Sequence, residues 1–504
     1  MNTRIKNILY LTCFAALLLV ASCAKDKGNY DLSSINEIII DNLITEDRLE
    51  VYFGESLAFT PIITQENVTD GKYEYRWYMI SRLSSTTYEL SNERNLTYNM
   101  LLPVGEYSLI YVVRDVNTGI STSLVTPIVV MSEFGNGLVI LEEGTQGGDI
   151  SQILLNGTVR RNLYSKANNG AYIPAPVGSL KGFYFTKAQL GQKSIYFFLT
   201  KQGQNSYELD SETYSKGPDI TSFLTFNYPA PLEIQAIAMD GRNDANYIIA
   251  DGQAIYAYAN TSVPRWIGYL TGDYYLAPFI ISGTDEENYS IPNRVFFIGY
   301  DQKHGRFLWY SGFNVGAISS YTTAPEEDSE FDPNQVNKNC VYAGYSNRLA
   351  YSNWLMKDET GMHLYQMYPV RSQKAGAGYK KIPYSAEMAN AHIFQGSTKL
   401  PHIYFAYKNQ IFLYDYESNL VREEYSFPVG EEVTALQFSV INKPSYDKRH
   451  QVIVTKDELY AATYTGNEGK VYEFKVPPTG ILSTPVNSFA GFGKVKDVYY
   501  KTGQ

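Results

Sequence analysis

Cysteine is scarce in this sequence: its 504 residues contain only Cys13, Cys23 and Cys340. We expect Cys13 to be removed with an N-terminal leader and Cys23 to be consumed by a modification, as argued below. Cys340, which opens an apolar run, would then be a buried, inert thiol without a disulfide partner. The sequence therefore predicts a fold that is stabilised by core packing alone, even though a leader would direct it to an oxidising compartment.

Histidine is also scarce, and the short catalytic motifs are missing. The sequence has no H-E-x-x-H, G-x-S-x-G, P-loop lysine or C-x-x-C pattern. The histidines are scattered without the spacing of metal ligands: His304, His363, His392, His402 and His450. The sequence therefore predicts no catalytic residues, no metal site and no cofactor apart from a covalent lipid.

Clusters of basic residues are absent as well. The net charge is −10, and loss of residues 1–22, which hold two basic and no acidic residues, would lower it to −12. Such a chain has no electrostatic footprint for nucleic acid. Anionic lipids would repel it, so attachment to a membrane would depend on acyl chains and not on a basic helix.

The longest apolar run, at residues 8–21, is too short to cross a bilayer. It spans about 14 residues, whereas a membrane-spanning helix needs ~20. Arg4 and Lys6 precede it and small residues end it, which is typical of a secretory signal peptide over residues 1–22. We therefore expect export of the chain and not a permanent transmembrane anchor.

The end of this leader carries a modification signal. Its sequence V-A-S-C, at residues 20–23, resembles a bacterial lipobox, in which the cysteine thiol is lipidated and the cysteine becomes the new N-terminus. Cys23 is thus the predicted lipid attachment site. The polar residues that follow, up to residue 33, lack hydrophobic periodicity and are expected to form a flexible tether.

The composition of the rest favours β-structure. There are 45 tyrosines and 24 phenylalanines, and aromatic residues favour the half-buried surface of a sheet. Glycines and prolines are spread between short apolar runs, and no convincing amphipathic helix follows the leader. The sequence predicts an all-β protein.

Residues 34–132 have the size and strand spacing of an immunoglobulin-like β-sandwich. Strand-length runs follow one another at short intervals: INEIII, LEVYFG, SLAFTPII, YEYRWYMI, TTYEL, NLTYNM, GEYSLIYVVRD and STSLVTPIVV. Trp77 lies in the middle of one run, where core packing is favoured over ligand stacking. The stretch GEYSLIYVVRDVNTG, at residues 105–119, resembles the signature of polycystic-kidney-disease-type (PKD) domains. In that signature a tyrosine enters the penultimate strand and an aspartate closes it before a glycine turn.

Residues 135–504 contain a loosely repeated unit of three or four strands. Six units are recognisable, one of them in IQAIAMDGRNDANYIIADGQAIYAYAN, and a seventh can be assembled from GLVILEE near the start and GKVKDVYYK near the end. Joining these two segments would close a ring and remove its exposed edges. We therefore predict a C-terminal β-propeller with seven blades, with six or eight as alternatives. KAGAGYK, at residues 374–380, is interpreted as a turn between blades.

Taken together, these segments resemble the PKD-like family of Bacteroidota lipoproteins. The resemblance rests on the lipobox, KDKGNYD after the cysteine, one PKD-like domain, GLVILEE…GGDISQI and the closing GFGKVKDVYYK. It implies a lipoprotein of the outer membrane, facing the extracellular side. It also implies association with a starch-utilisation-type transporter, which pairs a TonB-dependent barrel with a lid lipoprotein. It implies no binding residues.

Two functions remain open at this stage. The first is a noncatalytic accessory lipoprotein that binds a glycan or peptide or docks on the transporter. Its candidate ligand-binding residues are aromatic side chains assigned to loops, namely Trp266, Tyr274 and Tyr275. The alternative is a surface hydrolase or lyase in the propeller funnel, for which His392 and Asp240 near the ends of inner strands are candidates.

Overall fold

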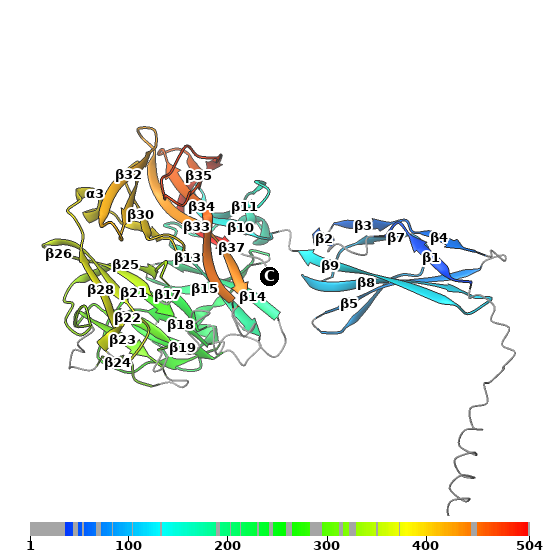
Figure 1. Cartoon of the computed structure of the whole chain (residues 1–504), viewed down its shortest axis with the longest axis horizontal. Coiled ribbons are helices and arrows are strands. Elements are labelled where there is room, and N and C mark those ends of the chain that lie inside the picture. The colour runs from blue at the N-terminus through cyan, green and yellow to red at the C-terminus, as the bar shows by residue number, and fades with distance from the viewer. Residues whose placement is uncertain are drawn as a thin grey trace, which may run out of the picture.

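The computed structural model describes residues 36–501, except for 44–48, 53–54, 67–71, 83, 103, 132–133, 188–191, 202, 212, 229–230, 241–244, 259–264, 283–294, 312–315, 322–328, 349–350, 372 and 445–450. Only the backbone is described at 183–187, 192–198, 200–201, 238–240, 245–246, 257–258, 265–267, 441–444 and 451–454. The described chain is almost entirely β-structure, arranged as a sandwich followed by a propeller (Figure 1). This confirms the predicted fold class.

The sandwich contains nine strands. A five-stranded sheet has the order β2-β9-β8-β5-β6, and the pairs β1-β4 and β3-β7 lie outside it. The strands are β1 (Ile38–Asp41), β2 (Leu49–Tyr52), β3 (Ser56–Phe59), β4 (Ile62–Gln65), β5 (Tyr73–Ser81), β6 (Thr87–Ser91), β7 (Leu96–Asn99), β8 (Gly105–Asp115) and β9 (Ser121–Met131). The predicted run SLAFTPII is divided into β3 and β4 at Thr60 and Pro61, because proline has no N–H to donate to a sheet.

Trp77 forms the centre of the sandwich core, as predicted. It is fully buried, its ring stacks on Tyr111 with centroids 4.0 Å apart, and its indole N–H donates to the Glu93 carbonyl at 3.0 Å. Asp115 ends β8 and accepts the Asn117 amide at 2.9 Å, just before the glycine turn. The PKD-like signature thus has the structural role that the sequence indicated.

The propeller consists of seven four-stranded sheets. The first contains β37 (Lys494–Lys501), β10 (Gly137–Gly144), β11 (Gly147–Leu154) and β12 (Val159–Arg160). The second contains β13 (Ser179–Lys187), β14 (Gln192–Lys201), β15 (Gln204–Asp210) and β16 (Lys216–Asp219). The third contains β17 (Ile234–Asp240), β18 (Ala245–Ala250), β19 (Gln253–Tyr258) and β20 (Arg265–Tyr269). The fourth contains β21 (Leu276–Ser282), β22 (Phe297–Asp301), β23 (Arg306–Tyr310) and β24 (Ser319–Ser320). The fifth contains β25 (Asn339–Tyr345), β26 (Ser352–Asp358), β27 (Gly361–Met367) and β28 (Gly376–Lys381). The sixth contains β29 (Ile393–Gly396), β30 (His402–Tyr407), β31 (Gln410–Asp415) and β32 (Leu420–Ser426). The seventh contains β33 (Glu432–Pro444), β34 (Gln451–Tyr464), β35 (Gly469–Lys475) and β36 (Asn487–Phe492).

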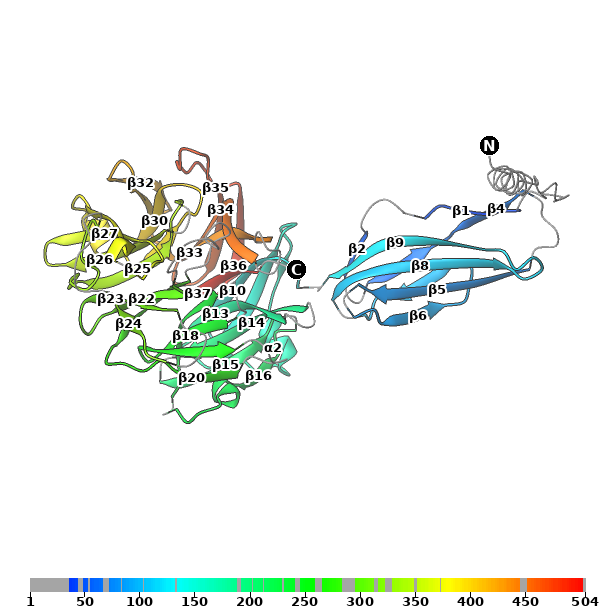
Figure 2. The same ribbon diagram turned by 60° about the horizontal axis from the view of Figure 1, so that its bottom comes forward.

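The ring closes through β37, which is the innermost strand of the first blade. β37 pairs antiparallel with β10, from Gly137 opposite Lys501 to Glu143 opposite Lys494. Each innermost strand contacts the next, and the series β13, β17, β21, β25, β29 and β33 returns to β37 (Figure 2). Both the seven-bladed ring and its closure by GKVKDVYYK are confirmed.

One local prediction is wrong, and two further details were not predicted. β34 is one continuous strand, and its pairing with β33 shifts register opposite the charged residues Lys456–Glu458. KAGAGYK forms most of the outer strand β28 and is not a turn between blades. The described residues also include two short helices, α2 (Leu163–Ala167) and α3 (Ala386–Ala389), both in connections between blades.

The antiparallel order of each blade gives the ring two distinct faces. We call one the hairpin face: it carries the turn between the second and third strand of every blade and the connections into each next inner strand. The inner strands begin at this face and end at the opposite face.

No helix among the described residues is both long and apolar enough to cross a membrane. Cys340 is buried in β25 and is a free thiol.

Candidate functional site

Tyr275 is an exposed aromatic residue of the propeller that contacts two hairpins. It lies on the hairpin face, in the connection between β20 and β21, and is 45% exposed. Its ring covers Gly252, where a Cβ atom would approach the ring carbons to 2.5–2.7 Å. Gly252 also has a φ of +69°, a backbone conformation that favours glycine. Both the close ring contact and this φ therefore disfavour any larger residue. One side of the tyrosine ring therefore rests on backbone, and the ring remains half exposed to solvent.

Two hairpins hold the backbone of Tyr275. Its N–H donates to Asp301 Oδ1 at 3.0 Å, and its carbonyl accepts the Gln302 amide at 2.8 Å. The next residue, Leu276, donates its amide to the Gly252 carbonyl at 2.8 Å. The ring is thus fixed between the third and fourth blades, which lowers the entropy lost when a ligand binds.

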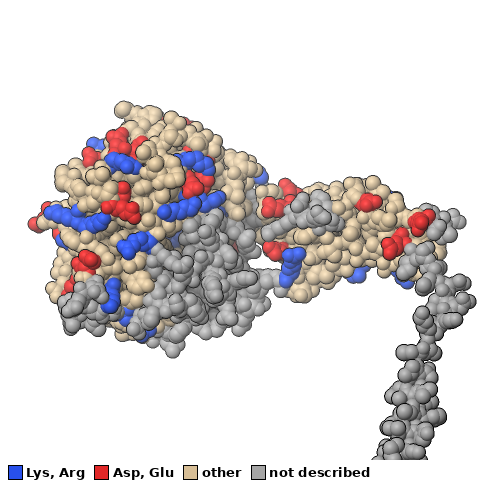
Figure 3. Space-filling model, viewed as in Figure 1, with Lys and Arg blue, Asp and Glu red and all other residues tan. Residues whose placement is uncertain are grey.

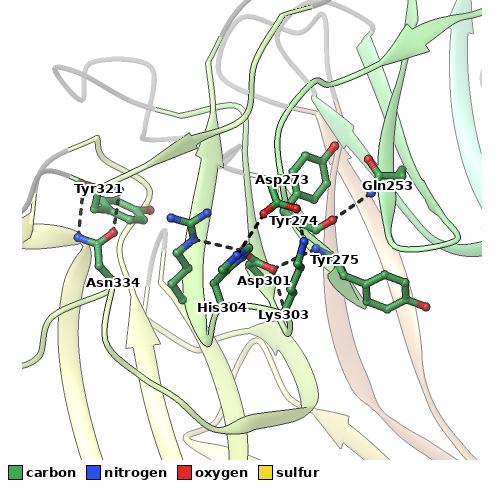
Figure 4. Close-up of polar contacts among 10 residues, drawn as sticks. Gln253, Asp273, Tyr274, Tyr275, Asp301, Lys303, His304, Tyr321 and Asn334 are labelled. Atoms are coloured by element: carbon green, nitrogen blue, oxygen red, sulfur yellow. Dashed lines mark hydrogen bonds and ion pairs between the residues drawn. The ribbon is translucent and has the colours of Figure 1, made fainter.

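Asp301, at the end of β22, organises this region. It is fully buried, and its carboxylate accepts hydrogen bonds on both oxygens (Figure 4). Besides the Tyr275 amide, Oδ1 accepts the Lys303 amide at 3.1 Å. Oδ2 faces His304 Nδ1 at 2.8 Å and accepts Arg306 Nε at 3.1 Å. A buried carboxylate with this many donors is a structural centre and has no free oxygen for a ligand.

An exposed polar rim borders the ring of Tyr275. Asp273, whose side chain is 73% exposed, forms an ion pair with Lys303, and its Oδ2 lies 3.4 Å from His304 Nε2. The hydrogen bond from Lys303, together with the charges of Lys303 and His304, holds the pKa of Asp273 below its usual range. The rim therefore presents an ionised carboxylate and an ammonium group, each with hydrogen-bonding capacity left for a ligand.

This arrangement is suited to binding. A rigid aromatic face beside fixed donors and acceptors matches a ligand that has one apolar face and polar groups around its edge. The described part of the site contains no nucleophile bonded to a general base. The rim could orient a ligand on the ring of Tyr275.

The three predicted ligand-binding residues have different environments. Tyr275 is exposed, as the prediction requires. Tyr274 is only 4% exposed, and its hydroxyl donates to the Leu270 carbonyl and accepts the Ala254 amide at 3.3 Å. Its ring belongs to the core, so the structure does not support it as a ligand-binding residue. Trp266 lies in strand β20 and not in a loop, and its side chain falls outside the described residues.

Two buried histidines have structural surroundings. His363 is 2% exposed, with Nδ1 3.0 Å from the Tyr379 hydroxyl and Nε2 3.0 Å from Asp358. His402 packs against Gly480, where a Cβ atom would approach the imidazole to 2.3 Å. Burial lowers the pKa of both histidines. Both are therefore expected to be neutral at physiological pH.

The residues considered for a funnel enzyme do not converge. His392 is exposed just before β29, at the hairpin face, whereas Asp240 ends β17, at the opposite face. Within the described ranges, no group of three or more His, Cys, Asp or Glu side chains could hold a metal ion. Cys23 and His450 lie outside the described residues.

Sequence reasoning missed most of the polar site. Asp273, Asp301, Lys303 and His304 were not selected, although an aspartate at the end of an apolar strand, four residues before Gly305, is a turn signal. Positive and negative side chains are interspersed over the coloured part of the propeller face drawn in Figure 3. The pairing of these residues with Tyr275 depends on contacts between two blades.

Fold and site together define a two-domain all-β protein, with a sandwich followed by a propeller. Residues 23–176 match the PKD-like family, so the match covers the sandwich and the start of the first blade. No curated protein matches the sequence.

Solved structures are similar to this chain at low identity. A quinonprotein alcohol dehydrogenase-like protein from Bacteroides thetaiotaomicron is 11% identical with a TM-score of 0.40, over 91% of this chain and 97% of that one. The extracellular domain of a one-component system from the same organism is 11% identical with a TM-score of 0.35, over 65% of this chain and 37% of that one. The WD40 domain of SCAP from fission yeast is 9% identical with a TM-score of 0.34, over 63% and 75%. These similarities assign neither a ligand nor an activity to this chain.

Proposed function

We propose that this protein is a lipid-anchored accessory protein of an outer-membrane nutrient transporter, and that it binds ligand without converting it. The lipid on Cys23 would hold the chain at the outer membrane, facing the extracellular side. The propeller would capture a glycan or peptide for a TonB-dependent barrel and its lid lipoprotein. The lipobox-like segment at residues 20–23 and the similarity to the PKD-like family support this proposal.

The observation that carries the proposal is the environment of Tyr275. Its ring is supported by Gly252 on one side and half exposed, and its backbone is fixed by Asp301. A connection with a purely structural role would not need hydrogen bonds and ion pairs that fix an exposed aromatic residue. Aromatic residues held in this way are typical anchors of binding surfaces.

The position in the membrane would reinforce weak binding. A lipid tether confines the protein to the same leaflet as its partners, which raises their effective concentration. The sandwich follows the tether in sequence, so it would act as a stalk or docking piece between the lipid and the propeller. Even a small docking surface on the transporter would then be occupied.

The proposal is tested by variants of Tyr275 in the full-length protein. Tyr275→Phe keeps the ring and should retain most ligand binding, whereas Tyr275→Ala should reduce it about tenfold or more, because stacking and burial are both lost. The readout is retention of a panel of glycans and peptides, with product analysis alongside. Equal binding by both variants would contradict the site, and release of cleaved products would contradict the noncatalytic role.

The proposed partners need a separate experiment. Pull-down of the native lipoprotein in mild detergent should recover the transporter barrel and its lid. Tyr275→Ala should leave this recovery unchanged if docking and ligand capture use different surfaces. Recovery of the lipoprotein alone after crosslinking would rule out the transporter part of the proposal.

A further inference from the structure

Tyr275 is one end of a longer aromatic surface, which we call the tyrosine strip: Phe226, Tyr228, Tyr269 and Tyr275. Phe226 and Tyr228 come from the connection that leads into β17, and Tyr269 ends β20. Because strands and connections of this kind meet at the hairpin face, all four residues lie on the same face of the third blade. The two ends of the strip, Tyr269 and Tyr275, are each 45% exposed.

Ring contacts join three members of the strip, and one hairpin connects these three to Tyr275. The ring of Phe226 meets that of Tyr269 edge to face, with centroids 5.8 Å apart, and meets that of Tyr228 at 6.3 Å. The Tyr228 hydroxyl donates to the Ala250 carbonyl at 3.2 Å, beside the hairpin that contains Gly252. Burial raises the pKa of Tyr228 to about 12, and the nearby charges of Asp251, Tyr275 and Tyr269 contribute to this shift. Tyr228 is therefore linked to Tyr269 through Phe226, and to Tyr275 through the hairpin that contains Ala250 and Gly252.

The geometry implies more than one contact position for a ligand. Phe226 and Tyr228 are half-buried, so they support the strip, while the two ends offer ring surface to solvent. Tyr269 contacts Phe226 and Tyr275 rests on Gly252, so the strip offers a ligand two separately supported rings. A chain of linked rings could stack on both and gain binding energy at each.

The charges around the strip indicate the kind of chain. Asp251, Asp273 and Asp301 bring three carboxylates, and Lys303 and Arg306 bring two cations, of which Lys303 is already paired with Asp273. This leaves no surplus of positive charge for an anionic ligand. Exposed ring faces next to a mixed donor and acceptor rim suit sugar rings, which combine apolar C–H faces with hydroxyl edges.

We propose that the ligand of this site is a neutral oligosaccharide that spans both ends of the tyrosine strip. This inference rests on the proposed ligand-binding function and specifies its substrate class. The chain stacks one sugar ring on Tyr275, where Asp273 and Lys303 bond its hydroxyls. It stacks a more distant ring on Tyr269. Affinity therefore increases with chain length until both ends are occupied.

The test uses the full-length protein on an array of defined neutral and anionic oligosaccharides and a peptide digest. Bound neutral glycans are then measured by calorimetry as hexasaccharide and disaccharide. Tyr269→Ala should weaken hexasaccharide binding about tenfold and leave disaccharide binding unchanged, whereas Tyr275→Ala should weaken both. Tyr384→Ala is the matched control, because Tyr384 is 84% exposed outside the strip, in the connection after β28, and should change neither.

The outcomes separate this inference from the proposed function. Tyr275-dependent binding of peptides or anionic glycans, without neutral ones, would overturn the substrate class and keep the site. Equal loss of disaccharide and hexasaccharide binding in Tyr269→Ala would overturn the two-position model. Absence of binding to any neutral oligosaccharide, with the transporter still recovered in the pull-down, would overturn the inference and leave the docking role.

Discussion

A single buried carboxylate connects the third and fourth blades to the exposed ring of Tyr275. Asp301 accepts the Tyr275 amide and also bonds His304 and Arg306. Its charge is balanced locally, so the region is rigid without needing a ligand. The exposed ion pair of Asp273 and Lys303, by contrast, is open to water and contributes little to stability.

Replacement of Asp301 should separate these two roles. Asp301→Asn keeps the shape but turns one acceptor oxygen into a donor that faces His304 or Arg306. We expect the free energy of unfolding to fall by about 1.5–3 kcal/mol, the range for hydrogen bonds to charged groups, and ligand binding to weaken with it. Urea unfolding provides the measurement. Asp273→Asn is the control and should change stability by less than about 0.5 kcal/mol, so equal losses would contradict the distinction.

Glu142 makes stability depend on pH at the junction of β10 and β37. Its carboxylate accepts the Gly493 amide and the Ser151 hydroxyl, and burial raises its pKa. A carboxyl whose pKa is higher in the folded state favours folding when protonated. The contribution of Glu142 to the free energy of unfolding is therefore fully present below about 4.5, the pKa of the carboxyl in the unfolded chain. This contribution is lost as pH rises through the higher pKa of the folded state.

Glu142→Gln should remove this part of the pH dependence. The neutral amide keeps an acceptor oxygen for the Gly493 amide but does not ionise. As pH rises from about 4 to about 8, the melting temperature of the wild type should fall relative to that of the variant. A constant difference between the two melting curves would show that folding does not shift the pKa of Glu142.

At the scale of elements, the blades were predictable because their signals are local. Apolar alternation and turn residues lie within each hairpin, so six blades and the closing segment were recognised from sequence. β34 also contains the charged residues Lys456, Asp457 and Glu458, at which its pairing with β33 shifts register. Asp457 pairs with Lys399 of the neighbouring blade, and Glu458 pairs with Lys475. Backbone pairing of β34 with β33 and β35 keeps this charged segment within one strand.

The candidate site could be predicted only in part for the same reason. Tyr275 was selected because paired tyrosines in a glycine-containing loop are conspicuous, and Tyr274 was selected with it. Which of the two is exposed depends on the packing of Tyr274 against Leu270 and on the support from Gly252. These contacts join separate connections, which a single sequence does not place relative to one another.

Removal of β37 tests the closure of the ring. Deletion of residues 493–504 would leave β10 with an unpaired edge and expose the apolar seam between the first and seventh blades. We expect aggregation or loss of the cooperative melting transition, measured by light scattering and calorimetry. Arg161→Ala is a milder comparison, since it removes only the side chain that donates to the Gly491 carbonyl at 2.7 Å. A truncated protein as stable as the wild type would mean that β37 is not needed for closure.

At the scale of the whole molecule, the proposed anchoring would depend on one residue, Cys23, near the start of the sequence. Cys23→Ala removes the thiol that lipid transfer requires, so the protein should be uncleaved or unanchored. Wild-type protein should be digested by protease added to intact cells, and fractionation should place it with the outer membrane. An alanine variant that is still processed and membrane-bound would contradict the lipobox interpretation.

The pairing of β37 with β10 would also set the order of folding events under the proposed export. Glu142 and Gly493 are hydrogen-bonded although 351 residues separate them. A chain that crosses a membrane from its N-terminus would release the sandwich first, then β10, β11 and β12 of the first blade without β37, and then the other six blades. Loop-closure entropy makes such a distant pairing slow. The exposed edge of β10 is therefore a predicted binding site for periplasmic chaperones, and it disappears when residues 494–501 arrive.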